Sequence, residues 1–276
     1  MIRLHRHRDQ KIPLSFRGQR RVKRERALLE AKRSGALKSH LKNSLWKPAK
    51  PNLIRETHGK CAYCEAPTDT VAHGDVEHFR PKSVWWWLAL CYDNYAFSCQ
   101  VCNQVFKGDA FPLSNSRMSG PSIRSNTSDE KIGSLAGTLA PDPLDAAEGF
   151  PRNHFFDACA AEKSLLPDPY AEDPEDLFAY EADEVLHEVR VVPRSPASTD
   201  RVVACETHLG LNRQPLRRDR WLRYETLRQV KQAWDVSPAA TRVLLSDLFR
   251  AEISADKSFA GMSRYFVKTV WQIPGL

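Results

Sequence analysis

Two pairs of cysteines with the spacing Cys-x-x-Cys constrain this chain more than any other feature of its sequence. The first pair is Cys61 and Cys64, and the second pair is Cys99 and Cys102. Thiolates separated by two residues can bind one zinc ion from a tight turn, and two such turns supply four ligands. The pattern predicts a closed, structural zinc site whose binding energy contributes to folding. The alternatives are buried cysteines with chance spacing or a redox pair, but a redox pair would not explain two pairs.

The other three cysteines have no partner at this spacing, so we expect small core residues at Cys91, Cys159 and Cys205. A reducing cytoplasm favours metal binding over disulfides for this pattern. No apolar run approaches the roughly 18–20 residues needed to cross a bilayer. The basic N-terminus has no apolar stretch after it and so does not resemble a secretory signal. We therefore expect a cytoplasmic protein that does not contact a membrane.

Charge is distributed unevenly along the 276 residues, although the net formal charge is only +7. Residues 1–60 contain 18 Lys and Arg against 4 Asp and Glu, whereas residues 141–190 contain 14 acidic and 3 basic residues. A basic segment indicates a polyanionic partner, most plausibly nucleic acid. The alternative is a solvated helix face. The acidic stretch could shield a site or dock a basic partner.

Periodicity and capping signals predict a mixed chain with more helix than strand. We expect helices over 19–42 (interrupted at Gly35), 48–58, 198–208, 213–234, 238–253 and 255–271. A hairpin is expected from strands at 177–180 and 185–192, with its turn at 182–184. Residues 114–140 lack periodicity and predict a surface loop, and residues 141–174 predict an irregular segment.

The region between the cysteine pairs contains residue types that hydrolyse phosphodiester bonds. We expect a strand at 76–80 and a helix that begins at or just after the second cysteine pair, which gives the order strand, strand and helix around the metals. Such hydrolysis needs a base that works near neutral pH, which histidine supplies, and a divalent cation that offsets charge on the phosphate. Glu77 and His78 supply a metal ligand and a base, and the amide of Asn94 could hold the imidazole in one tautomer.

The same residues resemble a known family. The motif consists of Cys61-x-x-Cys64, the sequence Val-Glu-His-Phe-Arg-Pro-Lys at 76–82, Asn94, and Cys99-x-x-Cys102-Asn103 followed by Lys107-Gly108. It is similar to the HNH, or ββα-metal, endonucleases. More narrowly, it resembles the PtuB-like HNH nuclease subunit of Septu-type and retron-linked anti-phage systems. The resemblance covers roughly residues 46–220, with gaps.

The resemblance implies a role for each motif residue. Glu77 matches the acidic metal ligand, His78 the general base, and Asn94 the asparagine that orients the base. Asn103 stands where many relatives have a histidine and would be the second metal ligand. Its hard amide oxygen suits Mg²⁺ or Mn²⁺ better than zinc. Asp75 is a further candidate ligand, although its shaping of the preceding turn is the favoured alternative.

Several basic and aromatic residues near the motif could contact nucleic acid. Arg80, Lys82 and Lys107 are candidates for binding phosphate, with ordinary surface charge as the alternative. The three tryptophans at 85–87 could stack on bases. Packing in the core is favoured for them because so small a metal-bound unit needs a core.

The resemblance implies an α+β fold with a ββα-metal core stapled by a four-cysteine zinc site. We expect a basic, mainly helical region at 1–58, the core at 59–113, an insertion at 114–175 that is acidic in its second half, and a hairpin with helices at 176–276. The implied activity is cleavage of nucleic acid, with DNA favoured over RNA. An ABC- or SMC-like ATPase is the implied partner. The alternative is a non-catalytic zinc module that binds nucleic acid or protein.

Overall fold

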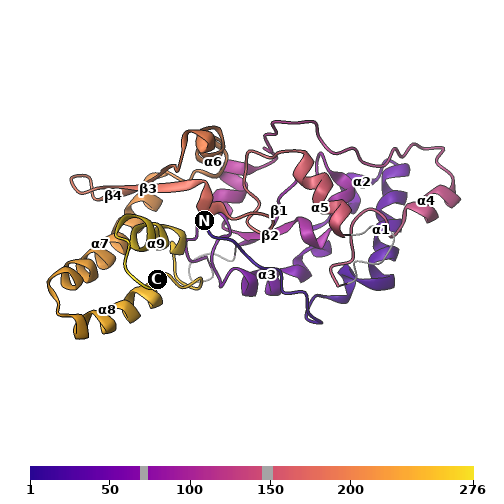
Figure 1. Ribbon diagram of the computed structural model, residues 1–276. Coiled ribbons are helices and arrows are strands. Elements are labelled where there is room, and N and C mark those ends of the chain that lie inside the picture. Colours follow the sequence, from indigo (N-terminus) through magenta and orange to yellow (C-terminus); the bar gives the residue numbers. More distant parts are fainter. Residues whose placement is uncertain (69–73, 145–151) are drawn as a thin grey trace.

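The computed structural model describes residues 1–68, 74–144 and 152–276, and they form two lobes joined side by side (Figure 1). The first lobe contains the motif region. Its helices and strands are α1 (Gly18–Arg33), α2 (Leu37–His40), α3 (Lys50–Glu56), β1 (Asp75–His78), β2 (Tyr95–Ser98), α4 (Asp129–Leu135) and α5 (Arg152–Ala161).

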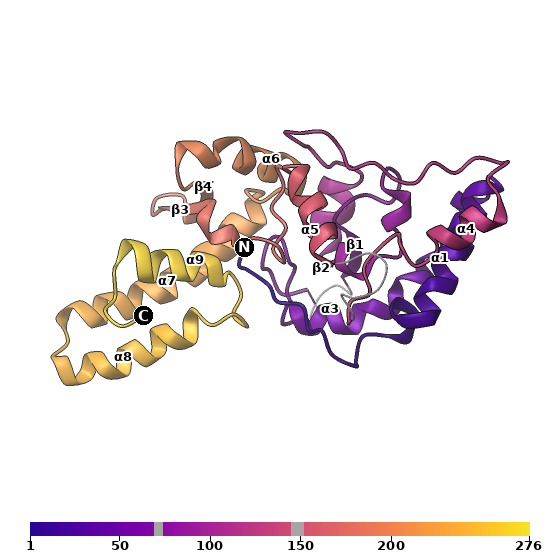
Figure 2. The ribbon, with the colours of Figure 1, turned by 45° about the vertical axis from the view of Figure 1, so that its right-hand side comes forward.

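The second lobe is built on a hairpin and a bundle of helices, and Figure 2 separates it from the first lobe. Its elements are β3 (Phe178–Asp183), β4 (Glu188–Pro193), α6 (Thr199–Leu209), α7 (Gln214–Val236), α8 (Ala239–Glu252) and α9 (Ala260–Arg264). Of the helices in the described residues, none has the length and apolar character needed to cross a membrane.

Strands β1 and β2 form an antiparallel pair at the centre of the first lobe. His78 lies opposite Tyr95 and Glu77 lies opposite Ala96. The connection between the strands is long, and a π-helix, η6 (Val101–Lys107), follows β2. The predicted order of strand, strand and helix is therefore present, and the helix begins between the cysteines of the second pair.

Most of the predicted helix boundaries agree with the structure. The first predicted helix is divided into α1 and α2 at Gly35, which has a φ of +75° that favours glycine. Helix α6 ends at Gly210 in the left-handed conformation. The last predicted helix is shorter than expected, because α9 begins at Ala260 and continues as the π-helix η9 (Tyr265–Val270).

Two segments predicted to lack helix contain one. Helix α4 lies in the expected loop, where the Ser128 hydroxyl accepts a hydrogen bond from the Lys131 amide and Ile132 is buried. Helix α5 lies in the segment expected to be irregular, and its Phe155 is buried. Each helix is short and buries one large side chain, so tertiary packing stabilises it more than its own periodicity does.

The hairpin of the second lobe is present, but its turn is displaced. Ala182 and Asp183 belong to β3, and the turn follows them. The Asp183 carboxylate accepts hydrogen bonds from the amides of Val185 and Leu186, which places the chain reversal after this residue.

The tryptophans at 85–87 are buried in the core of the first lobe. They pack with Leu28 and Leu29 of α1 and with Ile132 of α4. The core alternative for these three side chains is therefore confirmed, and none of them presents a face to a nucleic-acid base.

Candidate functional site

The four paired cysteines come together at one point in the first lobe. Cys61 and Cys64 lie on the turn that follows α3, and Cys99 and Cys102 lie at the start of η6. Their four sulfur atoms are within 4.8 Å of one another. The cluster can therefore hold a structural metal ion, and zinc fits a set of four thiolates.

One arginine of the second lobe lies against this cluster. The guanidinium of Arg213, at the start of α7, is 3.4 Å from the sulfur of Cys102, 3.7 Å from Cys64 and 3.9 Å from Cys99. Its positive charge offsets the negative charge of thiolates. The sequence at 211–213 resembles a joint between two helices that could bring Arg213 near the site, but it does not predict contact with three cysteine sulfurs.

Beside the cluster lies a polar cavity of about 250 Å³, which we call the His78 pocket. Strand β1, η6 and the chain before α3 form its walls. It brings together five of the eight predicted site residues outside the cysteine cluster. Among its lining residues are Trp46, Asp75, Glu77, His78, Lys82 and Asn103.

His78 is held in a defined orientation. Its Nε2 atom lies 3.0 Å from the carbonyl oxygen of Ala89, and its ring packs edge-on against Trp46 and Tyr95. A carbonyl oxygen only accepts hydrogen bonds, so the proton of the neutral imidazole is on Nε2 and the lone pair is on Nδ1. Burial lowers the pKa of His78 to about 3, so the imidazole is neutral at physiological pH.

Glu77 is paired with a buried lysine. The Lys107 ammonium lies 2.6 Å from Glu77 Oε1 and also donates to the carbonyl oxygen of His78. Burial raises the pKa of Glu77, and the positive charge of Lys107 opposes this shift. Lys107 is 1% exposed, so the predicted contact with phosphate does not fit its position. Its partner is the proposed metal ligand.

Asp75 faces η6. Residues 69–73 of the turn before β1 lie outside the described part of the chain, so the alternative that Asp75 shapes this turn stays a prediction. The Oδ2 atom of Asp75 accepts a hydrogen bond from Gln104 at 2.7 Å and a longer one from the amide nitrogen of Asn103 at 3.4 Å. This orientation leaves Oδ1 of Asn103 without a partner among the described residues. The sequence did not single out Gln104, because it carries no motif of its own.

Asn94 acts on a loop and does not contact the imidazole. Its Oδ1 accepts from the amide of Arg80 at 2.9 Å, and its Nδ2 donates to the carbonyl of Arg80 at 3.0 Å. The expected hydrogen bond from Asn94 to His78 is therefore absent. Ala89 makes that bond, and Asn94 stabilises the connection between β1 and β2 on which Ala89 lies.

Arg80 and Lys82 have different environments, although both were expected to contact phosphate. The Arg80 side chain is buried, and its Nε atom is 2.6 Å from Glu162 at the end of α5. It is therefore not available to a phosphate group. Lys82 lies with its ammonium over the ring of Trp46 at 5.3 Å and lines the His78 pocket.

Part of the chain is similar to a known protein. Over 111 residues the chain is 32% identical to Septu protein PtuB of Bacillus mycoides (strain KBAB4). Part of this chain is homologous to PtuB. The aligned part is 35% of this chain and 36% of that protein, so the chain spans about a third of the relative it matches. No family model matches the chain, and no solved structure matches it significantly.

The homology to PtuB confirms the PtuB-like resemblance expected from the motifs. The name of this relative says nothing of HNH chemistry. The chain has the mixed helix and strand composition and the four-cysteine cluster that were expected with it.

Proposed function

We propose that this protein is a metal-dependent endonuclease that hydrolyses phosphodiester bonds in nucleic acid, with DNA favoured over RNA. The observation that carries the proposal is the arrangement of His78. Its Nε2 donates a hydrogen bond to the carbonyl oxygen of Ala89, so Nδ1 is available as a base. Carboxylate and amide oxygens line the same pocket. An imidazole with an available lone pair beside such oxygens fits the general-base hydrolysis of a phosphodiester.

The oxygen atoms of the pocket suit a hard divalent cation. Asp75 and Glu77 offer carboxylate oxygens, and Asn103 offers its Oδ1. Mg²⁺ and Mn²⁺ prefer such ligands, and both keep positions open for water and phosphate. When bound, the ion would offset charge on the phosphate and on the leaving oxygen.

In the proposed reaction, Nδ1 of His78 accepts a proton from a water molecule while the water oxygen bonds to phosphorus. The bond from phosphorus to the 3′ oxygen breaks, and the departing oxygen keeps the electron pair and takes a proton from solvent. The products would be a 5′-phosphate and a 3′-hydroxyl, as the family resemblance implies. Ala89 keeps the second ring nitrogen protonated throughout, and Lys82 could hold the phosphate.

The four-cysteine cluster would have no part in this reaction. Four thiolates complete a tetrahedral zinc site and leave no open position for substrate. Its proposed role is to hold the turn after α3 against the start of η6, which provides Asn103 and Lys107. The zinc would therefore support the His78 pocket from one side.

The homology to PtuB supports a role in anti-phage defence. As the family resemblance implies, we propose that the chain acts in the cytoplasm with an ABC- or SMC-like ATPase. Nucleic acid would be the substrate, and the 18 basic residues among the first 60 support this.

The test is cleavage by the purified protein, alone and with its ATPase, of duplex DNA and of transfer RNA. Reactions contain Mg²⁺, Mn²⁺ or a chelator. We expect cleavage that requires the divalent ion and yields 5′-phosphate ends. Metal-independent binding without cleavage in any reaction would refute the nuclease and favour the non-catalytic zinc module.

A further inference from the structure

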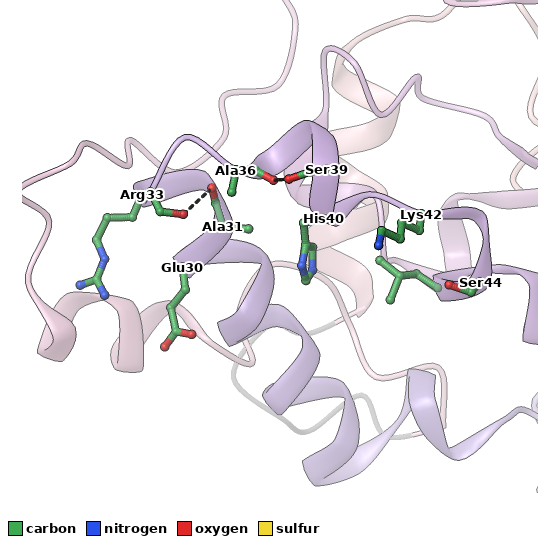
Figure 3. Close-up of a pocket in the computed structure, with 10 residues that line it drawn as sticks. Glu30, Ala31, Arg33, Ala36, Ser39, His40, Lys42 and Ser44 are labelled. Carbon is green, nitrogen blue, oxygen red and sulfur yellow. Dashed lines mark hydrogen bonds between the residues drawn. The ribbon is translucent and has the colours of Figure 1, made fainter.

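A hollow of about 690 Å³ lies between the last turn of α1 and the chain that leads through α2 into the short 3-10 helix η2 (Asn43–Leu45) (Figure 3). We call it the α1–α2 hollow. Among the residues that line it are Glu30, Arg33, Ser34, His40, Lys42 and Ser44.

The α1–α2 hollow and the His78 pocket share a wall. Lys42 and Ser44 line the hollow, whereas Asn43 and Trp46 line the pocket. Five residues span at most roughly 18 Å of chain. A nucleic-acid duplex advances about 3.4 Å per base pair, so about five base pairs cover this distance. One polyanion of this length is therefore long enough to reach from the pocket to the hollow.

The chain around the hollow has a strong excess of positive charge. Residues 30–50 contain six Lys and Arg but only one carboxylate. Lys42 is exposed, and within the described part of the chain it has no carboxylate partner. On the pocket side, Lys82 adds a further ammonium group over the ring of Trp46. Positive charge thus continues from the pocket to the hollow.

The acidic groups at the hollow are already paired. Glu30, the single carboxylate of the lining, lies 3.0 Å from the guanidinium of Arg26. Asp129 of α4 lies 2.6 Å from Arg33. Both contacts are exposed and weak, but they offset the negative charge that would otherwise repel a phosphate backbone.

The hydroxyl groups of the hollow offer few free donors. Ser34 donates to the carbonyl of Ala31, and Ser39 donates to the carbonyl of Ala36 (Figure 3). The surface therefore supplies charge more than a pattern of hydrogen-bond donors. Charge without such a pattern binds phosphates and does not read bases.

We infer that the α1–α2 hollow binds the phosphate backbone of the nucleic-acid arm that leaves the His78 pocket, chiefly through Lys42. The inference rests on the proposed function of that pocket. It names a second contact region, about five base pairs from the scissile bond, that binds without sequence preference.

Binding is tested in the His78→Ala background, so that no substrate is cleaved. Fluorescent DNA hairpins with stems of about 4 and about 30 base pairs, called the short and the long duplex, are titrated at several salt concentrations, because a stem of fewer than about five base pairs does not span the distance from the pocket to the hollow. Lys42→Glu should weaken binding of the long duplex by about tenfold and lower the salt slope by about one. Binding of the short duplex should change less than about twofold. The same titrations with RNA of the same lengths show whether the hollow binds DNA or RNA.

Lys268→Glu is the matched control, because Lys268 is an exposed lysine of η9 in the second lobe. An equal loss for both duplex lengths would overturn the inference, as would an equal loss in the control or no change with any DNA or RNA. Binding of an acidic peptide that depends on Lys42, with no binding of nucleic acid, would assign the hollow to a protein partner instead.

Cleavage by the wild-type chain is measured separately. Lys42-dependent binding without cleavage refutes the nuclease alone, and cleavage of the long duplex that Lys42→Glu does not affect refutes the hollow alone.

Discussion

His78 takes its orientation from a main-chain oxygen and not from a neighbouring side chain. The carbonyl of Ala89 accepts bonds both from Nε2 of His78 and from the hydroxyl of Tyr95. A main-chain acceptor survives side-chain substitution, provided that the loop carrying it keeps its shape. Asn94 stabilises that loop through hydrogen bonds with the amide and the carbonyl of Arg80. It is therefore a positioning residue that acts on His78 through the loop.

Replacing the proposed base gives the first prediction. His78→Ala should lower the cleavage rate by about 10²–10⁴-fold, the contribution expected of a general base. Circular dichroism and zinc content should match the wild type. His154→Ala is the control, because His154 is an exposed histidine of α5. Cleavage at the wild-type rate by the His78 variant would refute the assignment.

The buried pair of Lys107 and Glu77 gives the second prediction. Lys107→Met would leave the carboxylate of Glu77 buried without its counter-charge, which costs roughly 3–5 kcal/mol of unfolding free energy. Urea denaturation measures this loss. The double variant Lys107→Met with Glu77→Gln should recover most of it, because no charge is then buried. A double variant as unstable as the single one would contradict this explanation.

At the scale of elements, the four-cysteine cluster joins the turn after α3 to the π-helix η6. The chain around Cys61 and Cys64 is a turn with little apolar periodicity, and η6 begins beside Cys99. Neither segment is long enough to be stable alone. The metal should therefore determine whether β1, β2 and η6 hold their arrangement.

Removing one thiolate tests this dependence. We expect Cys61→Ser to lose zinc and to yield insoluble or unfolded protein, because structural zinc binding contributes directly to folding. Elemental analysis and thermal melting are the measurements. Cys159→Ser, which changes a half-buried cysteine outside the cluster, should retain both zinc and melting temperature. Normal zinc content and melting in the Cys61 variant would rule out the structural site.

For the whole molecule, Arg213 connects the second lobe to the metal cluster of the first. It stands at the start of α7, yet it contacts the sulfurs of Cys64, Cys99 and Cys102. A zinc ion with four thiolates carries a net charge of about −2, and this guanidinium offsets part of it. Packing of the two lobes and retention of the metal should therefore depend on each other.

Arg213→Ala should speed zinc release to a chelator by roughly 10–100-fold, the usual effect of removing a group that supports metal ligands. Arg213→Lys should give an intermediate rate, because it keeps the charge and loses the planar fork. Arg218→Ala, on the exposed face of α7, serves as the control. Equal release rates in all variants would show that Arg213 does not stabilise the cluster.

Much of the local structure could be predicted from the sequence. The interruption at Gly35 and the end of α6 at Gly210 depend on backbone freedom at single residues. The helices α4 and α5 could not be predicted in the same way. Each is stabilised by one buried side chain, Ile132 or Phe155, whose contacts come from distant segments.

In the candidate site, too, some features follow from the local sequence and others depend on contacts between distant segments. The spacing within each cysteine pair and the pair Glu77-His78 are local, because ligands on one turn or strand must be near one another in sequence. The sequence by itself therefore determined the four-cysteine cluster and the candidate base. Only the tertiary structure placed Arg80 on Glu162, Lys107 on Glu77 and Ala89 on His78. These contacts join residues 11 to 82 positions apart. Buried charges and polar atoms must find partners, and the fold alone decides which partner is within reach.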